Sequence, residues 1–525
     1  MKTSNMNPLG LIVFSIYLVA IGLISWISKR RWPTANDYLN ASRSLPLWVA
    51  ALSFLAFNCG SIEVIGMSAM AAQYGIQALH FYWIGGIPGM VFMGVVVLPV
   101  YMRTGARSLP EYLGRRFGNR VRLLNASVAL AGTLAYAGVA LYTIAQVLHV
   151  LLGWNFLAGG LICAGIVLVY VSIGGVRASI FTSIFQLFVL IAGLAPLLFM
   201  TVHFDAATWA ERSERWHLWK PLPVFSPSAP LDQIGVIIGL GFVISFSYWC
   251  TDFVMIQRAL TARTVDDARM VPIFAGFGKL VIAFLIVLPG VAGPALLHGR
   301  ASFDQTMPAL MALEYSPALL ALGAAALLAG LMAWLAGNIS GFSALCVEEI
   351  YRRRLRPDRS EAHYIRASRL AIFAGLLIAQ IVAYATFLFH DMMEFLQLIV
   401  ALFYAPVFAA VLEGVCTRRT SERGAYTGIC AGVVSGFVLQ AAWWLHVVRF
   451  GSQMTADFYT AALSFSIAAL GCALWREKEL RDSQRPAEAA SESAISLETT
   501  RPGRGLVALS GALLALCLLL NLLWW

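Results

Sequence analysis

Long apolar stretches alternate with short polar segments along almost the whole chain. An α-helix needs about 20 mostly apolar residues to cross about 30 Å of membrane hydrocarbon, and all its backbone hydrogen bonds must close within the span. The pattern therefore predicts 14 transmembrane helices in an all-α integral membrane protein. The expected spans are residues 8–28, 46–75, 79–102, 123–152, 156–175, 180–203, 233–256, 271–297, 317–350, 369–389, 392–415, 425–447, 457–475 and 505–525.

The polar segments divide the chain further. Residues 205–232 form a predicted external loop, and residues 476–504 form a polar cytoplasmic linker rich in Ser, Ala and Glu, for which we predict disorder. A flanking helix lies in residues 1–45, and its basic cluster follows the apolar run, so we expect a retained anchor and not a cleaved signal. Two more flanking helices occupy residues 416–475, and residues 505–525 form a C-terminal transmembrane helix.

Composition agrees with a lipid environment. Only 12% of the residues are charged, about half of the roughly 25% found in soluble globular domains. Of the 37 Lys and Arg residues, 30 fall in loops on one side of the predicted membrane and 6 on the other. Because cytoplasmic loops retain basic residues, this asymmetry places both termini outside. The net charge of +10 is thereby explained by topology, so we expect acidic lipid headgroups as neighbours and no nucleic acid.

Two spans carry polar interruptions at corresponding positions. Transporter cores are often two inverted repeats, with helices broken near the substrate at matching places. Counting five spans from each interrupted helix gives halves of 46–204 and 233–415, and an odd number of spans inverts the second half. Small residues also permit close helix packing, which is the alternative explanation. The interrupting residues are Asn58, Gly60 and Ser61 in the second span, and Ser245, Ser247, Thr251 and Asp252 in the seventh.

Three ionisable side chains fall inside predicted spans: Glu63, Asp252 and Lys279. An ionised group at membrane depth costs at least about 2.5 to 3.5 kcal/mol, so it usually faces a water-filled cavity or a partner. The two acids follow the two interruptions. We therefore expect a charge-paired trio that lines one cavity. The alternatives are that Asp252 lies near the cytoplasmic end and that Lys279 extends to the interface.

Other polar residues are weaker candidates for the same pathway. His80 and Tyr82 open the third span and have the chemistry to stack on a sugar-like ligand, although an aromatic belt at the interface explains them equally. Asn338 and Ser340 in the ninth span and Gln397 in the eleventh have spacing suited to line a path, with helix packing as the alternative. The chain contains no catalytic or nucleotide-binding motif, so we predict that it is not an enzyme.

The sequence resembles the sodium:solute symporter family over at least residues 8–450, and within it a bacterial branch labelled sodium/galactose cotransporters. The resemblance implies a five-plus-five inverted-repeat (LeuT-like) core with two discontinuous helices, in a bacterial inner membrane. The matching segments are FNCGSIEVIGMSA in span two, ARSLPEYLGRRFGNR (106–120), YVSIGGVRASIFTSIFQ (170–186), SYWCTDFVMIQRALTAR (247–263) and GNISGFSALCVEEIY (337–351).

The resemblance also implies roles for single residues. Glu63 falls where sugar-transporting relatives place a sugar-contacting Gln or His, Asp252 where they place an Asn, and Lys279 where a bacterial relative places a Lys. Gln397 matches a sugar-contacting Gln. Together with the candidates from the pattern, the predicted substrate-binding set is Asn58, Glu63, His80, Tyr82, Asp252, Lys279 and Gln397.

The family's sodium ligands are not all present. In the family, carbonyls of the first broken helix and two adjacent hydroxyls of the helix matching span nine hold sodium. Ala333 and Trp334 occupy those hydroxyl positions here, and Ser183 replaces an acidic residue. Since sodium prefers oxygen ligands, the coupling ion is open between Na⁺ and H⁺, with no resident cofactor or metal expected. The ion-coupling candidates are Ser61, Glu63, Asn338 and Ser340.

These observations together predict a secondary active transporter that moves a small polar organic solute, by resemblance a sugar, through alternating access. Three alternatives stay open. One is a proton-coupled permease and another a facilitative permease, in either case for an amine or an acid. The third is a nutrient receptor that has lost transport.

Overall fold

The computed structural model describes residues 8–28, 45–106, 108–202, 213–417, 419–476 and 503–525. Within these residues it contains helices and no strand, apart from two isolated bridges. The first part of the chain forms α1 (Pro8–Ser28), α3 (Leu47–Asn58), α4 (Ser61–Tyr74), η2 (Gly75–Leu79), η3 (Phe81–Gly86), α5 (Ile87–Phe92), η4 (Met93–Val97), α6 (Leu98–Arg103), α7 (Leu109–Phe117), α8 (Asn119–Leu152) and α9 (Phe156–Val202).

The second part begins with the short turn η5 (Ser213–Trp216). It continues with η6 (Gly235–Ile244), α11 (Ser245–Thr251), α12 (Phe253–Ala259), α13 (Val265–Leu297), η7 (Phe303–Gln305), α14 (Thr306–Glu314), α15 (Pro317–Ala344), η8 (Leu345–Leu355), α16 (Glu361–Ala385) and η9 (Thr386–Leu388). The remaining elements are α17 (Met392–Ile399), η10 (Val400–Tyr404), α18 (Ala405–Cys416), α19 (Glu422–Trp444), α20 (Gln453–Leu474) and α22 (Arg504–Leu523). The all-α prediction is confirmed.

The predicted spans appear as helices. Among the described residues, ten helices are long and apolar enough to cross a membrane, and two bent helix pairs qualify as further spans. The two other predicted spans correspond to α1 and to the first part of α9, which contain the shorter apolar segments Ser15–Ile24 and Phe156–Ser172. The chain is therefore a multi-span membrane protein. The predicted disordered linker falls almost wholly in residues 477–502, outside the described part.

Helix α9 covers two predicted spans, and its contacts show that the chain turns back within it. Phe156 packs against Phe387, with ring centroids 4.9 Å apart, at the end of α16. The carbonyl of Gly193 accepts a hydrogen bond of 2.8 Å from Tyr315, just before α15 and at the same end of the bundle. A straight helix would separate residues 156 and 193 by about 55 Å. The two predicted spans thus run in opposite directions.

Ion pairs join several helices at one end of the bundle, which we call the basic end. Arg122 at the start of α8 forms a bidentate pair with Glu349 of η8, at 2.6 and 2.9 Å. Arg476 pairs with Glu413 of α18 at 3.0 Å. The last residues of α22 lie at the opposite end, where Trp524 accepts a hydrogen bond of 2.9 Å from the backbone of Leu218.

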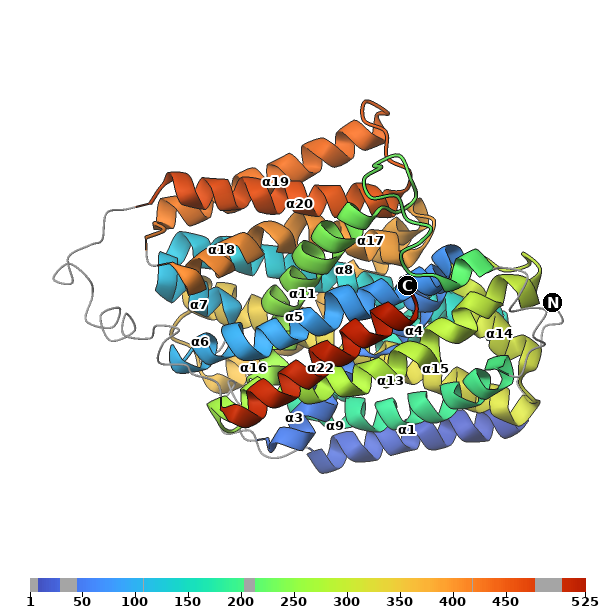
Figure 1. Cartoon of the computed structure of the whole chain (residues 1–525). Coiled ribbons are helices and arrows are strands. Elements are labelled where there is room, and N and C mark those ends of the chain that lie inside the picture. Colours follow the sequence, from blue (N-terminus) through green and yellow to red (C-terminus); the bar gives the residue numbers. More distant parts are fainter. Residues whose placement is uncertain (1–7, 29–44, 107, 203–212, 418, 477–502) are drawn as a thin grey trace.

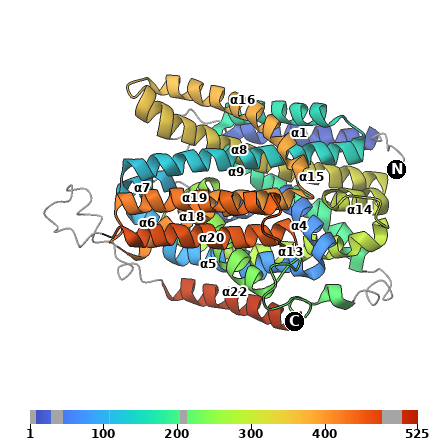
Figure 2. The same ribbon diagram turned by 90° about the horizontal axis from the view of Figure 1, so that it is seen from above.

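The figures show how the flanking helices surround the core. In Figure 1, α19 and α20 lie along one edge of the bundle and α1 along the other, with all three running in nearly the same direction as the core helices. In Figure 2, α22 lies on one side of the bundle, and α1 and α16 lie on the other. The elements between these edges come from the two predicted repeats, so the broken helices are enclosed by protein.

Two spans are bent at the predicted interruptions. The axes of α3 and α4 differ by 49°, and those of the η6–α11 segment and α12 by 61°. At the first bend Gly60 is extended and approaches the carbonyl of Gly330 so closely that an added Cβ would lie 3.0 Å from the oxygen. At the second bend Asp252 is extended, with ψ of 122°. The prediction of two discontinuous helices is confirmed.

We predict that the Arg122–Glu349 pair stabilises the contact between α8 and η8 at the basic end. Its side chains are only 11% and 7% exposed, so Arg122→Gln leaves a buried carboxylate unpaired and should cost about 3 kcal/mol. The measurement is thermal unfolding of the purified protein. Adding Glu349→Gln to the Arg122 variant should restore part of the loss, and a double variant no more stable than Arg122→Gln would contradict the assignment.

The matched control is Arg352, which pairs with Glu348 and Glu361 at 3.4 and 3.0 Å but is 34% exposed. Because exposed ion pairs contribute about 0 to 1 kcal/mol, Arg352→Gln should change the unfolding temperature little. An equal loss of thermal stability in both variants would show that burial of the Arg122–Glu349 pair does not determine its contribution.

Candidate functional site

A cavity of about 130 Å³ lies between the two bent spans. At about 30 Å³ per molecule of liquid water, that volume corresponds to about four water molecules, and a cavity of similar size binds a ring as large as benzene. Both halves of the chain contribute to its wall, as expected for a site between inverted repeats. The lining residues are Asn58, Ile62, Glu63, Met67, Phe81, Tyr82, Gly86, Tyr136, Leu240, Ile244, Ser245, Tyr248, Trp249, Lys279, Trp334, Met393, Leu396, Gln397 and Val400.

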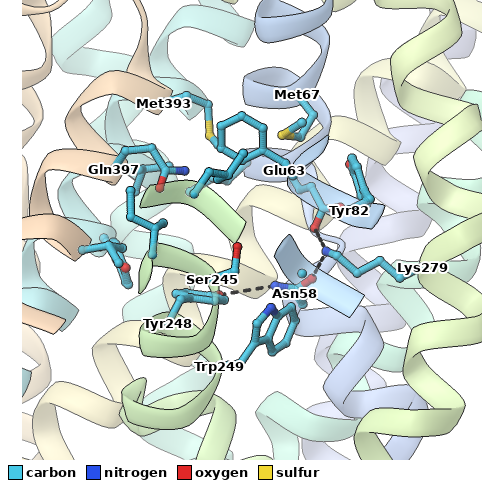
Figure 3. A pocket seen from close by; sticks show the side chains of 18 of the residues that line it. Asn58, Glu63, Met67, Tyr82, Ser245, Tyr248, Trp249, Lys279, Met393 and Gln397 are labelled. Atoms are coloured by element: carbon cyan, nitrogen blue, oxygen red, sulfur yellow. Dashed lines mark hydrogen bonds and ion pairs between the residues drawn. The ribbon is translucent and has the colours of Figure 1, made fainter. Parts of the chain in front are cut away.

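An ion pair joins the first broken helix to α13 at this cavity. The Lys279 ammonium donates to Glu63 Oε2 at 2.7 Å and also to Asn58 Oδ1. Asn58 in turn donates through Nδ2 to the Tyr248 hydroxyl at 3.4 Å, on α11 next to the second bend. Figure 3 shows Lys279 reaching Asn58 and Glu63 from one side of the cavity, with Gln397 across from them. Opposite charges thus meet where the helix is interrupted, which reduces the cost of burying them.

Aromatic rings surround the ammonium group. The Lys279 nitrogen lies 5.0 Å from the ring centroid of Tyr82 and 5.4 Å from that of Trp249. These separations are within the range of favourable cation–π contacts. Trp249 also stacks on Phe54, with centroids 5.6 Å apart, and meets Tyr248 edge to face. The cavity therefore has rigid, flat walls beside its charged pair.

Five buried polar atoms of the lining have no hydrogen-bond partner within the described part of the chain: Glu63 Oε1, Gln397 Oε1, Trp334 Nε1 and the hydroxyls of Tyr82 and Tyr136. The first two accept hydrogen bonds, and the indole nitrogen donates one. A buried polar group without a partner costs about 1 to 3 kcal/mol. A solute or water molecules that supply both donors and acceptors would satisfy all five.

Five of the predicted substrate-binding residues are brought together at the cavity. These are Asn58, Glu63, Tyr82, Lys279 and Gln397. Their parts in binding remain predictions. His80 lies elsewhere: its Nε2 meets the Leu218 carbonyl at 3.0 Å, and its ring packs against Trp219, with centroids 4.3 Å apart. It holds the segment before η6 and does not line the cavity.

Asp252 is placed differently from the prediction of a charged trio. Its carboxylate accepts a hydrogen bond of 2.8 Å from Met255 N and caps α12, and it is approached by the Tyr404 hydroxyl at 3.4 Å. It lies one turn beyond Trp249 toward the basic end. Ser245, two turns earlier on the same span, lines the cavity instead. A residue at a helix break satisfies the free backbone groups of the next helix before it can serve a ligand.

The predicted ion-coupling residues are also dispersed. Asn338 and Ser340 hydrogen-bond back to their own helix, at Trp334 O and Ala336 O, and neither lines the cavity. The side chain of Ser61 lies outside the described residues. Glu63 is the candidate that reaches the cavity, where it is already paired with Lys279.

The position expected to supply sodium-binding hydroxyls is filled by an aromatic stack. Trp334 and Phe57 stack with centroids 4.7 Å apart and planes 8° from parallel. The guanidinium of Arg258, which is buried, lies 4.6 Å from the Phe57 ring centroid and donates to Ser53 and Ser179. Ser183 donates to its own helix at Ser179 O. Among the described residues, no group of three or more His, Cys, Asp or Glu side chains is arranged to hold a metal ion.

Several lining residues were absent from the predicted set, above all Tyr136, Tyr248, Trp249 and Trp334. Tyr248 and Trp249 had a signal in the sequence, because they lie within one turn of the second interruption. Tyr136 and Trp334 had none. They lie in long helices that are apolar on all faces, so no periodicity marks the side that turns inward.

Comparison with known proteins gives consistent matches. The model of the family described as "Sodium:solute symporter family" matches residues 38–432. The chain is 27% identical to the sodium/glucose cotransporter of Vibrio parahaemolyticus, over 81% of this chain and 84% of the relative. It is 26% identical to sodium/glucose cotransporter 4 of Danio rerio, over 81% and 70%.

Two solved structures share the fold. A Na⁺-coupled sialic acid symporter in a substrate-bound outward-open state aligns with a TM-score of 0.76 at 17% identity, over 90% of this chain and 98% of that one. A nucleobase-cation-symport-1 family transporter with bound bromovinylhydantoin aligns with a TM-score of 0.57 at 15% identity, over 90% and 99%. The predicted LeuT-like, five-plus-five architecture is confirmed.

We predict that Asp252 acts as a helix cap. Asp252→Ala removes the acceptor for Met255 N and should lower the free energy of unfolding by about 1 kcal/mol. Asp252→Asn keeps an acceptor oxygen and should cost less. Thermal unfolding of both variants is the measurement. If Asn proves as destabilising as Ala, the carboxylate charge and not the cap is what the protein requires.

Proposed function

The chain belongs to the sodium:solute symporter family, and from this premise we propose that it is a secondary transporter for a sugar-sized polar solute, working by alternating access in a bacterial inner membrane. One observation carries the proposal: a cavity between two broken helices that presents unpaired acceptors, an unpaired donor and aromatic rings. Family and fold are those of transporters and not of enzymes.

The chemistry of the lining suits a polyhydroxylated solute. Each sugar hydroxyl both donates and accepts, so it can serve the acceptors on Glu63 and Gln397 and the donor on Trp334. Aromatic residues of the lining, among them Tyr136 and Tyr248, supply apolar surface for the C–H groups of a sugar ring. The names of the relatives point in the same direction, since they mention glucose and sialic acid.

The arrangement of contacts supports alternating access. On the side toward the basic end, the Phe57–Trp334 stack and Tyr248 close the cavity, and the Arg122–Glu349 pair ties α8 to η8 at that end. A solute that binds the outward and inward states unequally shifts their populations. Movement of one bundle against the other would then require these contacts to separate in one of the two states.

The aromatic stack favours transport without sodium at the position that the family uses. Neither Ala333 nor the Trp334 ring supplies an oxygen, and sodium requires oxygen ligands. We therefore propose a facilitative or proton-linked mode. A receptor without transport is the remaining alternative, and it differs in binding solute with no uptake.

Membrane orientation follows from the basic end. By the preference of cytoplasmic loops for Lys and Arg, we propose that this end faces the cytoplasm. The contact of Trp524 with Leu218 lies at the other end of the bundle, which supports the proposal that the last helix ends outside.

Uptake into proteoliposomes tests the proposal. Labelled glucose and galactose should enter saturably, and an inward sodium gradient should not drive accumulation above the outside concentration, because the stack occupies the cation position. Protein-free liposomes give the background, and an inward proton gradient distinguishes the facilitative from the proton-linked mode. Accumulation driven by sodium would contradict the coupling proposal, and binding without uptake would favour the receptor.

The role of the cavity is tested with a matched pair of buried glutamines. Gln397 lines the cavity, whereas Gln380 on α16 is equally buried but lies outside the lining. Gln397→Leu removes an acceptor for the solute and should reduce the apparent affinity for sugar by about tenfold. Gln380→Leu should leave the affinity unchanged. Equal effects of both substitutions on the affinity would show that the cavity is not the binding site.

A further inference from the structure

The cavity contains two charged lining side chains, and they neutralise each other. Glu63 and Lys279 are the ionisable acid and base among its lining residues. Their ion pair is 2.7 Å long, and the side chains are 10% and 6% exposed. Because the pair is nearly removed from water, its two charges are not screened by solvent as surface charges are. The net charge that a solute meets in this cavity is zero.

The Lys279 ammonium is already occupied. It donates to Glu63 Oε2 and Asn58 Oδ1, and the ring faces of Tyr82 and Trp249 lie on its remaining sides. Two of its three N–H donors are in use and aromatic rings lie beside the group, so a solute carboxylate that binds Lys279 has to compete with Glu63 for it. Displacement of Glu63 would leave its carboxylate buried without its partner, which is strongly unfavourable.

The second carboxylate oxygen of Glu63, Oε1, is placed to accept a hydrogen bond from a solute. Glu63 Oε1 is buried and has no partner in the part of the chain that the structure describes. It accepts a hydrogen bond from a neutral hydroxyl but repels another carboxylate. The pair thus offers an acceptor to a neutral solute and a penalty to an anionic one.

Other charged side chains nearby do not change this balance. Asp252 caps α12 one turn beyond the cavity. Arg258 is directed away, toward Ser53 and Ser179. Neither lines the cavity.

We propose that the Glu63–Lys279 pair sets the charge selectivity of transport, so that neutral sugars are accepted and sugar acids rejected, with Glu63 as the determining residue. The inference rests on the proposed function and restricts its solutes to neutral sugars. Without the Glu63 charge the cavity should favour anionic sugars, and without the Lys279 charge it should favour cationic sugars.

The experiment compares three sugars of similar size and different charge: glucose, glucuronate and protonated glucosamine. Their dissociation constants are measured by calorimetry on the purified full-length wild type, Glu63→Gln, Lys279→Gln and the double variant. Wild type should bind glucose more tightly than glucuronate by about tenfold or more. Glu63→Gln leaves Lys279 uncompensated and should shift the glucuronate-to-glucose ratio by at least about tenfold toward glucuronate.

Lys279→Gln should shift the preference toward glucosamine by a similar factor, because Glu63 then lacks its partner. The double variant is neutral again and should return to glucose. It also guards against misfolding, since it buries no unpaired charge. Asp252→Asn is the matched control, because it changes a buried carboxylate to an amide outside the cavity, and the ratios should stay at the wild-type values.

Three outcomes overturn the inference. Wild type binding glucuronate as tightly as glucose would do so, as would single variants that shift the ratios in the same direction, or Asp252→Asn shifting them as much as Glu63→Gln. In each case the sugars still bind and the proposed function stands. If none of the three sugars binds any folded variant, the proposed function fails and the inference fails with it.

Discussion

The requirement that no charge or backbone polar group be left unpaired in lipid controls this structure. Breaking a helix inside a membrane exposes backbone donors and acceptors that only nearby protein can satisfy. At the second break the Asp252 cap on α12 meets this need, and at the first break the extended Gly60 lets the chain approach the backbone of Gly330. The flanking helices keep these interruptions away from lipid, and Lys279 binds Glu63 and Asn58 across the first of them. Architecture and candidate site are thus consequences of one constraint.

Much of the fold was predictable because a lipid environment permits few kinds of membrane-spanning structure. Every predicted apolar span corresponds to a helical segment, since length and hydropathy are nearly sufficient when all hydrogen bonds must be internal. The interruptions were also visible, because Asn58 and Gly60 have no place in an uninterrupted apolar helix. The pairing of Glu63 with Lys279 follows from the cost of an isolated charge at membrane depth.

The features that sequence reasoning missed depend on the direction in which a side chain points, and not on its position along the chain. Asp252 follows its interruption as Glu63 follows the first one, yet one carboxylate turns back to cap a helix and the other reaches the cavity. The sequence does not distinguish these two placements, because either one gives a buried carboxylate a hydrogen-bond partner. Trp334 shows the same limit: in a helix that is apolar all round, the sequence carries no mark of the side facing the cavity. Three-dimensional packing decides both cases.

The Phe57–Trp334 stack has a consequence for the direction of flux. A carrier that binds a driving ion moves its cargo uphill, and the ratio it maintains depends on the ion's electrochemical gradient. A carrier in the proposed facilitative mode has no such source of free energy, so it would bring the two compartments to equality and work equally well in reverse. Net entry of cargo would then be set by how fast the cell consumes it, which makes intracellular metabolism the motor of the process.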